Sequence, residues 1–345
     1  MGNKFMLAFL ALSMLTATTS GCVKGDSTAK APAQTTSKIE VSASSASSKT
    51  GTLSDPKATK EAQALYTYLC DSFGKVMISC QQESTWMGSP DYEVDYIKEV
   101  TGKYPAMRGL DFMNGDFDGV VERSKAWHEK GGIVTICWHT GINGKGYQES
   151  LNDTPDFEKL LTPGTPEYKG MVANWDKAAD ALSKLQDENI PVLWRPFHEF
   201  DGQWFWWGKG GKENFVKLWQ MMYDYFTKEK GLHNLIWVLG YSGDVKDGWY
   251  PGNDYCDIIG SDTYDNSTNK KAWKHLSAMN TGKPMAFHEC GLVPSVEKFE
   301  EDEDLWSYFM IWHTDYIKKN DKENLKEVYN SEKVITLDEV QIPER

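Results

Sequence analysis

Short apolar runs alternate with longer amphipathic segments along most of this chain. The eight short runs are continuously apolar or β-branched, as expected for strands of a parallel sheet that is buried on both faces. They span residues 76–80, 106–111, 133–138, 192–197, 235–239, 258–262, 285–288 and 308–312. The segments between them have the apolar spacing of helices that cover such a sheet.

Helices are predicted between the strands, and the clearest span residues 92–101, 118–130, 168–189 and 213–230. The pair Gly131-Gly132 is a typical helix stop. Eight successive βα units predict an α/β fold of the (β/α)8 TIM-barrel type. A doubly wound open sheet is the main rival, but its first strand is normally followed by a glycine-rich phosphate loop. Residues 81–88, Q-Q-E-S-T-W-M-G, do not form one.

The N-terminal region has the pattern of an export signal and a tether. Lys4 precedes an apolar run, residues 5–15, that is too short to cross a bilayer, and Gly21-Cys22 follows. This resembles a bacterial lipoprotein signal, which implies cleavage after residue 21 and lipidation of Cys22; a plain secretory signal is the alternative. Residues 22–55 are rich in Ser, Thr and Ala and predict a flexible tether, and residues 56–345 form the folded domain.

Both kinds of signal predict that the protein is exported. We expect a monomer that contacts a membrane only through the lipid at Cys22, on the periplasmic or surface face of the outer membrane, or that is secreted if Cys22 is not lipidated. A net charge of -13 argues against nucleic acid as a partner. A neutral or cationic ligand fits this charge better, and the 13% of aromatic residues, many in glycine-bearing stretches, favour a binding function.

Cysteine spacing and motifs indicate no metal or cofactor. With Cys22 lipidated, at least one of the remaining five cysteines is free, although Cys70 and Cys80 are close enough in sequence to pair. No spacing of Cys and His is typical of zinc, and the chain lacks H-E-x-x-H, a P-loop and G-x-S-x-G.

Polar and aromatic residues end the predicted strands, where a TIM barrel builds its active site. These strand ends are Trp138-His139, His198-Glu199, Asp262-Thr263-Tyr264, His288-Glu289 and Trp312-His313. Glu199 and Glu289 are each preceded by Phe-His and end strands four and seven. Glycoside hydrolysis needs two carboxyl groups beside the scissile bond, and roughly 5 to 5.5 Å between them gives a retaining mechanism. We expect these two glutamates to be that pair.

The segment 194–208, W-R-P-F-H-E-F-D-G-Q-W-F-W-W-G, is the most specific stretch, together with S-D-T-Y-D at 261–265 and F-H-E-C-G at 287–291. From about residue 57 onward the chain resembles glycoside hydrolase family 26, best known for β-mannanases. The resemblance implies that Glu199 is the acid/base and Glu289 the nucleophile of a retaining endo-β-1,4-mannanase (mannan endo-1,4-β-mannosidase) acting on mannan, galactomannan or glucomannan.

The same resemblance implies roles for further residues. His139, His198, Trp204, Trp207, Tyr264 and Trp312 would bind substrate, with Tyr264 donating a hydrogen bond to Glu289 and Trp312 lying beneath a sugar ring. Asp262 would orient a neighbouring group. Arg195 supports either the barrel interior or catalysis directly. Trp206 is expected to pack, and Trp207 suits packing as well as binding. His313 stands where some relatives carry a substrate-binding Arg.

Several alternatives remain open at the level of sequence. The shared glutamates do not separate mannanases from mixed-linkage β-glucanases, β-1,3-xylanases or an exo-acting enzyme that releases mannobiose. A barrier that would favour exo action would lie in the long connection of residues 140–166. A non-catalytic glycan-binding lipoprotein is the rival of a different class.

Overall fold

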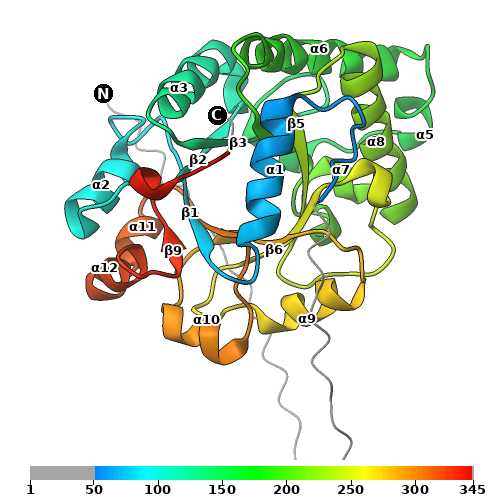
Figure 1. Ribbon diagram of the computed structural model, residues 1–345. Helices are drawn as coiled ribbons and strands as arrows, with labels where there is room; N and C mark the ends of the chain where they lie inside the picture. The colour runs from blue at the N-terminus through cyan, green and yellow to red at the C-terminus, as the bar shows by residue number, and fades with distance from the viewer. Residues whose placement is uncertain (1–50, 344–345) are drawn as a thin grey trace, which may run out of the picture. The chain divides into compact units, whose positions relative to one another are not determined.

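Residues 51–343 are described by the computed structural model, and eight parallel strands in this range close into a barrel surrounded by helices (Figure 1). Each strand pairs with the next, and β1 pairs with both β8 and β2, which completes the ring. The strands are β1 (Met77–Gln82), β2 (Met107–Asp111), β3 (Ile133–Cys137), β4 (Val192–Arg195), β5 (Leu235–Tyr241), β6 (Ile258–Thr263), β7 (Met285–Cys290) and β8 (Tyr308–Ile311), with a short β9 (Val334–Ile335) beside β1. The predicted TIM barrel is confirmed.

Side chains on each strand alternate between two hydrophobic clusters. Leu193 and Ile236 belong to one cluster, whereas their neighbours Trp194 and Trp237 belong to the other. Because successive side chains of a strand point to opposite faces, the first cluster fills the barrel interior and the second lies beneath the surrounding helices. Side chains of the first helix, such as Leu65, belong to the interior cluster and cover one end of it.

The helices begin and end largely where the sequence pattern places them. They are α1 (Lys60–Ser72), α2 (Tyr92–Thr101), α3 (Phe117–Glu129), α4 (Tyr147–Asn152), α5 (Phe157–Leu160), α6 (Pro166–Asp187), α7 (Trp206–Lys209), α8 (Lys212–Asp224), α9 (Lys270–Ala278), α10 (Val296–Asp302), α11 (Tyr316–Lys319) and α12 (Lys322–Tyr329). The hydroxyl of Thr165 caps α6 by accepting from the Tyr168 N–H, ahead of Pro166 in the first turn. Beyond α3, Gly131 adopts a φ of 92°, as the predicted stop requires.

The fourth strand ends two residues before the predicted position. Pro196 has no N–H to donate to a neighbouring strand, and both Phe197 and Glu199 have a φ of 53°. A left-handed backbone cannot continue a strand, so the chain leaves the barrel wall after Arg195 and carries Glu199 onto the mouth. The first strand is longer than predicted and includes Gln82.

The folded domain begins earlier than predicted. The expected tether reaches residue 55, whereas the structure buries Leu53 and Asp55 in the domain. The Ser54 N–H donates to Asp257 Oδ1 at 2.6 Å, and Asp55 Oδ2 lies 2.7 Å from His233 Nδ1. The predicted signal, residues 1–21, and the lipidation site Cys22 lie outside the described residues. Within residues 51–343, no helix combines the length and apolar character needed to cross a membrane.

All five cysteines in the described range are free thiols, so the Cys70–Cys80 pairing considered above is not formed. Cys80, Cys137, Cys256 and Cys290 are buried, and burial raises the pKa of each thiol above its usual value. Protonated and enclosed, they pack as small apolar side chains.

Candidate active site

The residues predicted from the strand ends converge at one end of the barrel. Asp262 in β6 and Glu289 in β7 are partners in the sheet register, just after a local irregularity of pairing. Glu199 follows β4, His139 follows β3, and Trp312 follows β8. The parallel barrel therefore brings residues that are far apart in sequence to a common mouth.

Glu289 is held by donors on both carboxylate oxygens. Arg195 Nη1 donates to Oε1 at 3.1 Å, and the Tyr264 hydroxyl donates to Oε2 at 2.9 Å. The side chain of Glu289 is 2% exposed. Burial raises its pKa above the usual value, and Arg195, His139 and Tyr264 partly offset that rise. The carboxylate is thus enclosed but supplied with partners for its charged form.

Arg195 connects Glu289 to the inside of the barrel. Its Nε donates to Thr135 Oγ1 at 3.1 Å, and Nη2 donates to Gln82 Oε1 at 3.0 Å. Nη1 also lies 2.9 Å from His288 Nε2. Since a guanidinium can only donate, His288 Nε2 accepts, and the neutral His288 ring donates from Nδ1 to Asp262 Oδ1 at 2.6 Å. These bonds fix the guanidinium plane.

Glu199 has a different environment from Glu289. Its Oε2 accepts a hydrogen bond from Trp204 Nε1 at 3.0 Å, and its backbone N–H donates to Gly240 O at 2.8 Å. Burial and the charge of Glu289 raise the pKa of Glu199 to about 7. The pKa of Asp262 is raised well above its usual range by burial and by both glutamates. The charge of Glu289 thus disfavours ionisation of both neighbouring carboxyl groups, whereas a hydrogen bond with Asp262 lowers the pKa of Glu199.

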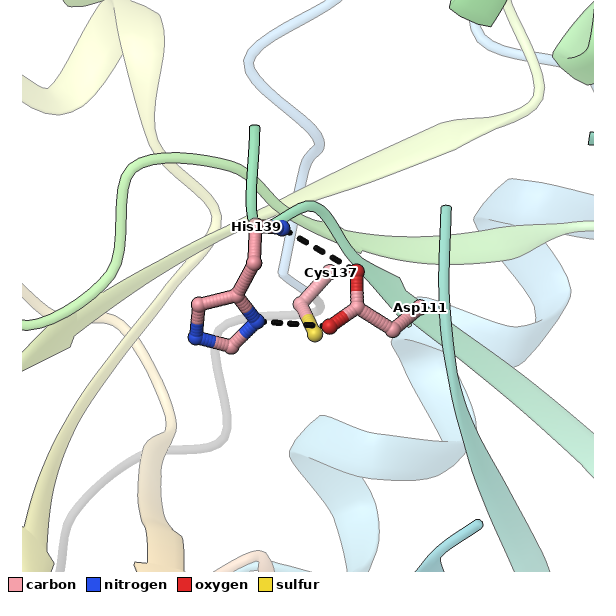
Figure 2. A group of neighbouring side chains, drawn as sticks. All are labelled: Asp111, Cys137 and His139. Carbon is pink, nitrogen blue, oxygen red and sulfur yellow. Dashed lines mark hydrogen bonds and ion pairs between the residues drawn. The ribbon is translucent and has the colours of Figure 1, made fainter. Parts of the chain in front are cut away.

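Two histidines lie edge to face beside Glu289. His139 Nε2 is 3.1 Å from His198 Nε2, and His198 Nε2 is 3.8 Å from Glu289 Oε1. Figure 2 shows Asp111 at the other side of His139, with one carboxylate oxygen on the ring and one on the backbone N–H. Burial opposes charge on His139, but Asp111 and, after it, the two glutamates together outweigh burial and raise the pKa of His139. Burial and the charge of His139 lower the pKa of His198 well below its usual value.

The predicted aromatic residues divide into exposed and buried groups. Trp204 is 42% exposed and Tyr264 is 40% exposed, and both hydrogen-bond a glutamate of the pair. Trp312 is largely buried at the mouth. Trp207, predicted to bind substrate, is 0% exposed and donates from Nε1 to His198 O at 2.8 Å. It is therefore enclosed in packing and supports the His198 backbone, as Trp206 supports Thr140 O.

Comparison with known proteins identifies the family. The family model described as glycosyl hydrolase family 26 matches residues 54–339. This chain belongs to that family. It is 32% identical over 314 residues to a mannan endo-1,4-beta-mannosidase of Thermothelomyces thermophilus, covering 84% of this chain and 63% of that protein. Mannan endo-1,4-beta-mannosidase A of Piromyces sp is 32% identical over 310 residues, covering 84% of this chain and 50% of that protein.

Solved structures of the family agree with this barrel. A ruminal GH26 endo-beta-1,4-mannanase is 35% identical with a TM-score of 0.79, covering 86% of this chain and 71% of that one. A second structure is a beta-mannanase from a symbiotic protist of the termite Reticulitermes speratus, complexed with gluco-manno-oligosaccharide. It is 32% identical with a TM-score of 0.76, covering 84% of this chain and 98% of that one. The chain spans 50% to 63% of the length of its first curated relatives.

Two groups in the described residues contain metal-ligand side chains at the mouth of this family 26 barrel: Asp262, His288 and Glu289, and Asp111, Cys137 and His139. In the first group both nitrogens of His288 are already bonded, and the Arg195 cation lies against it. In the second, burial and Asp111 raise the pKa of Cys137 well above its usual value, which keeps the thiol protonated. The donor chemistry of both groups fits hydrogen bonding rather than a cation.

The long connection between β3 and α6 is fixed against the loop that follows β4. Trp206 Nε1 donates to Thr140 O at 2.8 Å, and Lys209 Nζ donates to Asp153 O at 3.0 Å. The connection carries Tyr147, whose ring centroid is 5.3 Å from that of His139. It therefore forms one wall of the site.

His313 lies at the opposite side of the mouth and is not a cation. Its ring meets the exposed Trp86 edge to face, with centroids 5.0 Å apart. Burial and the charge of His139 lower the pKa of His313 to about 4. Both rings line a cavity together with Gln82, Asp111 and Asn114. A positively charged contact is thus absent from this position.

Asp111 and Tyr147 are site residues that sequence reasoning missed. Asp111 ends the second predicted strand, so inspection of that strand end would have found it. Tyr147 lies in the loop wall, and only its packing against His139 reveals it.

Proposed function

We propose that this chain is a retaining endo-β-1,4-mannanase that hydrolyses internal bonds of mannan, galactomannan or glucomannan by double displacement. One observation carries the proposal: two buried carboxyl groups share the barrel mouth, and only one of them is paired with a cation. Glu289 has Arg195 and Tyr264 as donors, whereas Glu199 has a pKa raised to about 7 by burial and by Glu289. Pairs of carboxyl groups whose environments differ in this way divide nucleophile and acid between them.

Glu289 is the nucleophile in this proposal. Its ionised form is balanced by the Arg195 cation and by the Tyr264 hydroxyl, so attack on the anomeric carbon starts from a carboxylate of fixed orientation. Arg195 itself is anchored at Thr135 and Gln82, which limits movement of the carboxylate during the reaction.

Glu199 is the general acid and then the general base. A pKa of about 7 keeps it largely protonated below neutral pH, ready to protonate the leaving oxygen. Once Glu289 is esterified by the sugar, its negative charge is gone, and that charge is what helps raise the Glu199 pKa. The Glu199 pKa therefore falls at the step in which it must accept a proton from water.

The substrate class rests on charge, exposed rings and relatives. The chain has a net charge of -13, which disfavours an anionic polymer. Trp204 and Tyr264 offer exposed aromatic surface beside the two glutamates, suited to neutral sugar rings. Relatives at 32% identity are named mannan endo-1,4-beta-mannosidases. In this assignment His139, Trp204, Tyr264 and Trp312 surround the sugar at the cleavage point, and Asp262 orients His288.

The test is hydrolysis by the purified protein of mannan, glucomannan, lichenan and β-1,3-xylan, measured as new reducing ends. We expect release from the first two, with a rapid fall in viscosity that marks internal cleavage. Mannobiose as the sole early product would instead show exo action. No release from any mannan would refute the proposal.

We further propose that the protein is exported and anchored as a monomer through a lipid on Cys22, on the periplasmic or surface face of the outer membrane. The support is the short apolar run of residues 5–15 followed by Gly21-Cys22. Radiolabelled palmitate should enter the wild-type protein and not Cys22→Ala, which should become soluble. Labelling of Cys22→Ala would refute the anchor, and light scattering tests the monomer.

A further inference from the structure

Asp111 contacts His139 at two points, the ring and the backbone N–H (Figure 2). Its Oδ2 lies 2.6 Å from the ring Nδ1, and its Oδ1 accepts from the His139 backbone N–H at 3.0 Å. The same Oδ1 accepts from the Met113 N–H at 2.9 Å. The carboxylate therefore fixes both the position and the rotation of the ring, and few directions remain for another donor.

The other ring nitrogen of His139 points at a second histidine. His139 Nε2 and His198 Nε2 are 3.1 Å apart, and the rings meet at 88°. One of the two nitrogens must carry the hydrogen. His198 Nε2 lies 3.8 Å from Glu289 Oε1, so the four side chains form a continuous series from β2 to β7.

We propose that Asp111 is a positioning residue for this active site, acting through His139 and His198 on Glu289. The inference rests on the proposed function for its catalytic consequence, but its structural content does not. Asp111 keeps His139 as an imidazolium, whose Nε2–H donates to a neutral His198. The positive charge then lies one ring away from Glu289 Oε1, the oxygen that Arg195 also contacts.

The groups around His139 favour this distribution of the proton. Burial opposes the charge, whereas Asp111 and, more weakly, Glu289 and Glu199 raise the pKa of His139. The neighbouring histidines stay neutral and do not compete with His139 for the proton. Burial and the charges of His139 and Arg195 lower the pKa of His198. Burial and the charge of His139 lower the pKa of His313. Tyr147 faces the ring from α4, and burial and the two glutamates raise its pKa, so it stays neutral.

The charge on His139 reaches both glutamates. Burial raises the pKa of Glu289, and His139 offsets part of that rise after Arg195. His139 also lowers the pKa of Glu199 against burial and the Glu289 charge. Without Asp111 the imidazolium loses its main partner, and both glutamates become harder to ionise. The acidic limb of the pH profile, which reports ionisation of Glu289, should then move to higher pH.

The direct test is a measurement on the unaltered protein. Imidazole ¹H–¹⁵N spectra should show His139 with both nitrogens protonated at neutral pH, and His139→Gln assigns its signal among the 7 histidines. A neutral His139 ring in the wild-type protein would overturn the proposal. Because this spectrum requires no turnover, it decides the proposal even if the protein hydrolyses no mannan.

The kinetic test is Asp111→Asn, which keeps the shape and removes the charge. We expect kcat to fall by about 10- to 100-fold with KM changed by less than about threefold, and the acidic limb to rise. Asp116→Asn is the matched control: it removes a carboxylate from the same loop, one paired with Arg123, and should leave the acidic limb in place. The double variant Asp111→Asn/His139→Gln should have a kcat only slightly below that of His139→Gln alone, since both changes remove the same positive charge at His139.

Three results would contradict a positioning role. A KM increase of tenfold or more at unchanged kcat would mean that Asp111 contacts sugar. If the fold-losses of kcat in the two single variants multiply in the double variant, Asp111 does not act through His139. A lower melting temperature with an unmoved acidic limb would mean that Asp111 only supports the fold.

Discussion

The Nη1 of Arg195 lies 3.1 Å from Oε1 of Glu289, and both side chains are enclosed at the centre of the barrel mouth. The same guanidinium is anchored by Gln82 and Thr135 from two other strands. A buried carboxylate with one cationic partner depends on that partner, because its ionised form has no water to replace it.

We predict that Arg195→Met destabilises the protein by about 3 to 5 kcal/mol, the usual cost of leaving one member of a buried ion pair alone. It should also abolish hydrolysis, since the pKa of Glu289 rises further. Urea unfolding monitored by fluorescence measures the first effect. Lys184→Met breaks the exposed pair with Asp118 and should cost less than about 1 kcal/mol. Equal losses of unfolding free energy in the two variants would contradict the central role of Arg195.

Glu289→Ala and Glu199→Ala should lose activity in different ways. Removal of the nucleophile should lower turnover by a factor on the order of 10⁴ or more while leaving mannan binding nearly intact. Glu199→Ala should retain slow cleavage of aryl glycosides, which need no acid, and azide should accelerate it by attacking the glycosyl intermediate. Azide products of retained configuration would assign the acid/base; rescue of Glu289→Ala with inverted product assigns the nucleophile. The reverse pattern would exchange their roles.

The fold and the glutamate pair were accessible from sequence for physical reasons. Parallel strands buried on both faces appear as short apolar runs, so all eight barrel strands were predicted, whereas the two-residue β9 was not. A barrel also places every strand end at the same mouth, which linked Glu199 to Glu289 without knowledge of the contacts.

What sequence left undetermined depends on long-range packing. Arg195 and Gln82 are 113 residues apart, and nothing local to either indicates that they bond. Trp204 and Trp207 stand in one aromatic stretch, yet the first is 42% exposed and the second is fully buried. The missed Asp111 acts on a residue from the next strand, so its role follows from the ring orientation that Figure 2 shows.

The alkaline limb of the pH profile should respond to Trp204. The reaction needs protonated Glu199, so kcat/KM should fall as pH rises through about 7. The indole N–H of Trp204 stabilises the ionised carboxylate, so Trp204→Phe should raise the Glu199 pKa and move this limb up by about half to one pH unit. Trp86→Phe, which changes an exposed ring without a bond to Glu199, should not move it. A downward movement in Trp204→Phe would contradict the assignment.

Ionisation of Glu199 should also destabilise the folded protein at high pH. Its folded-state pKa of about 7 exceeds the unfolded value of 4.5, so the folded state binds the extra proton between these limits. The contribution of Glu199 to stability is therefore full below about pH 4.5, declines as pH rises through 7, and is absent well above it; the loss is about 3 kcal/mol. Glu199→Gln cannot ionise and should escape this loss. Its melting temperature should exceed that of the wild-type protein by more at pH 8 than at pH 5, with the exposed Glu332→Gln as control. An equal difference at both pH values would mean that Glu199 ionises normally, and the acid/base assignment would then lose its physical basis.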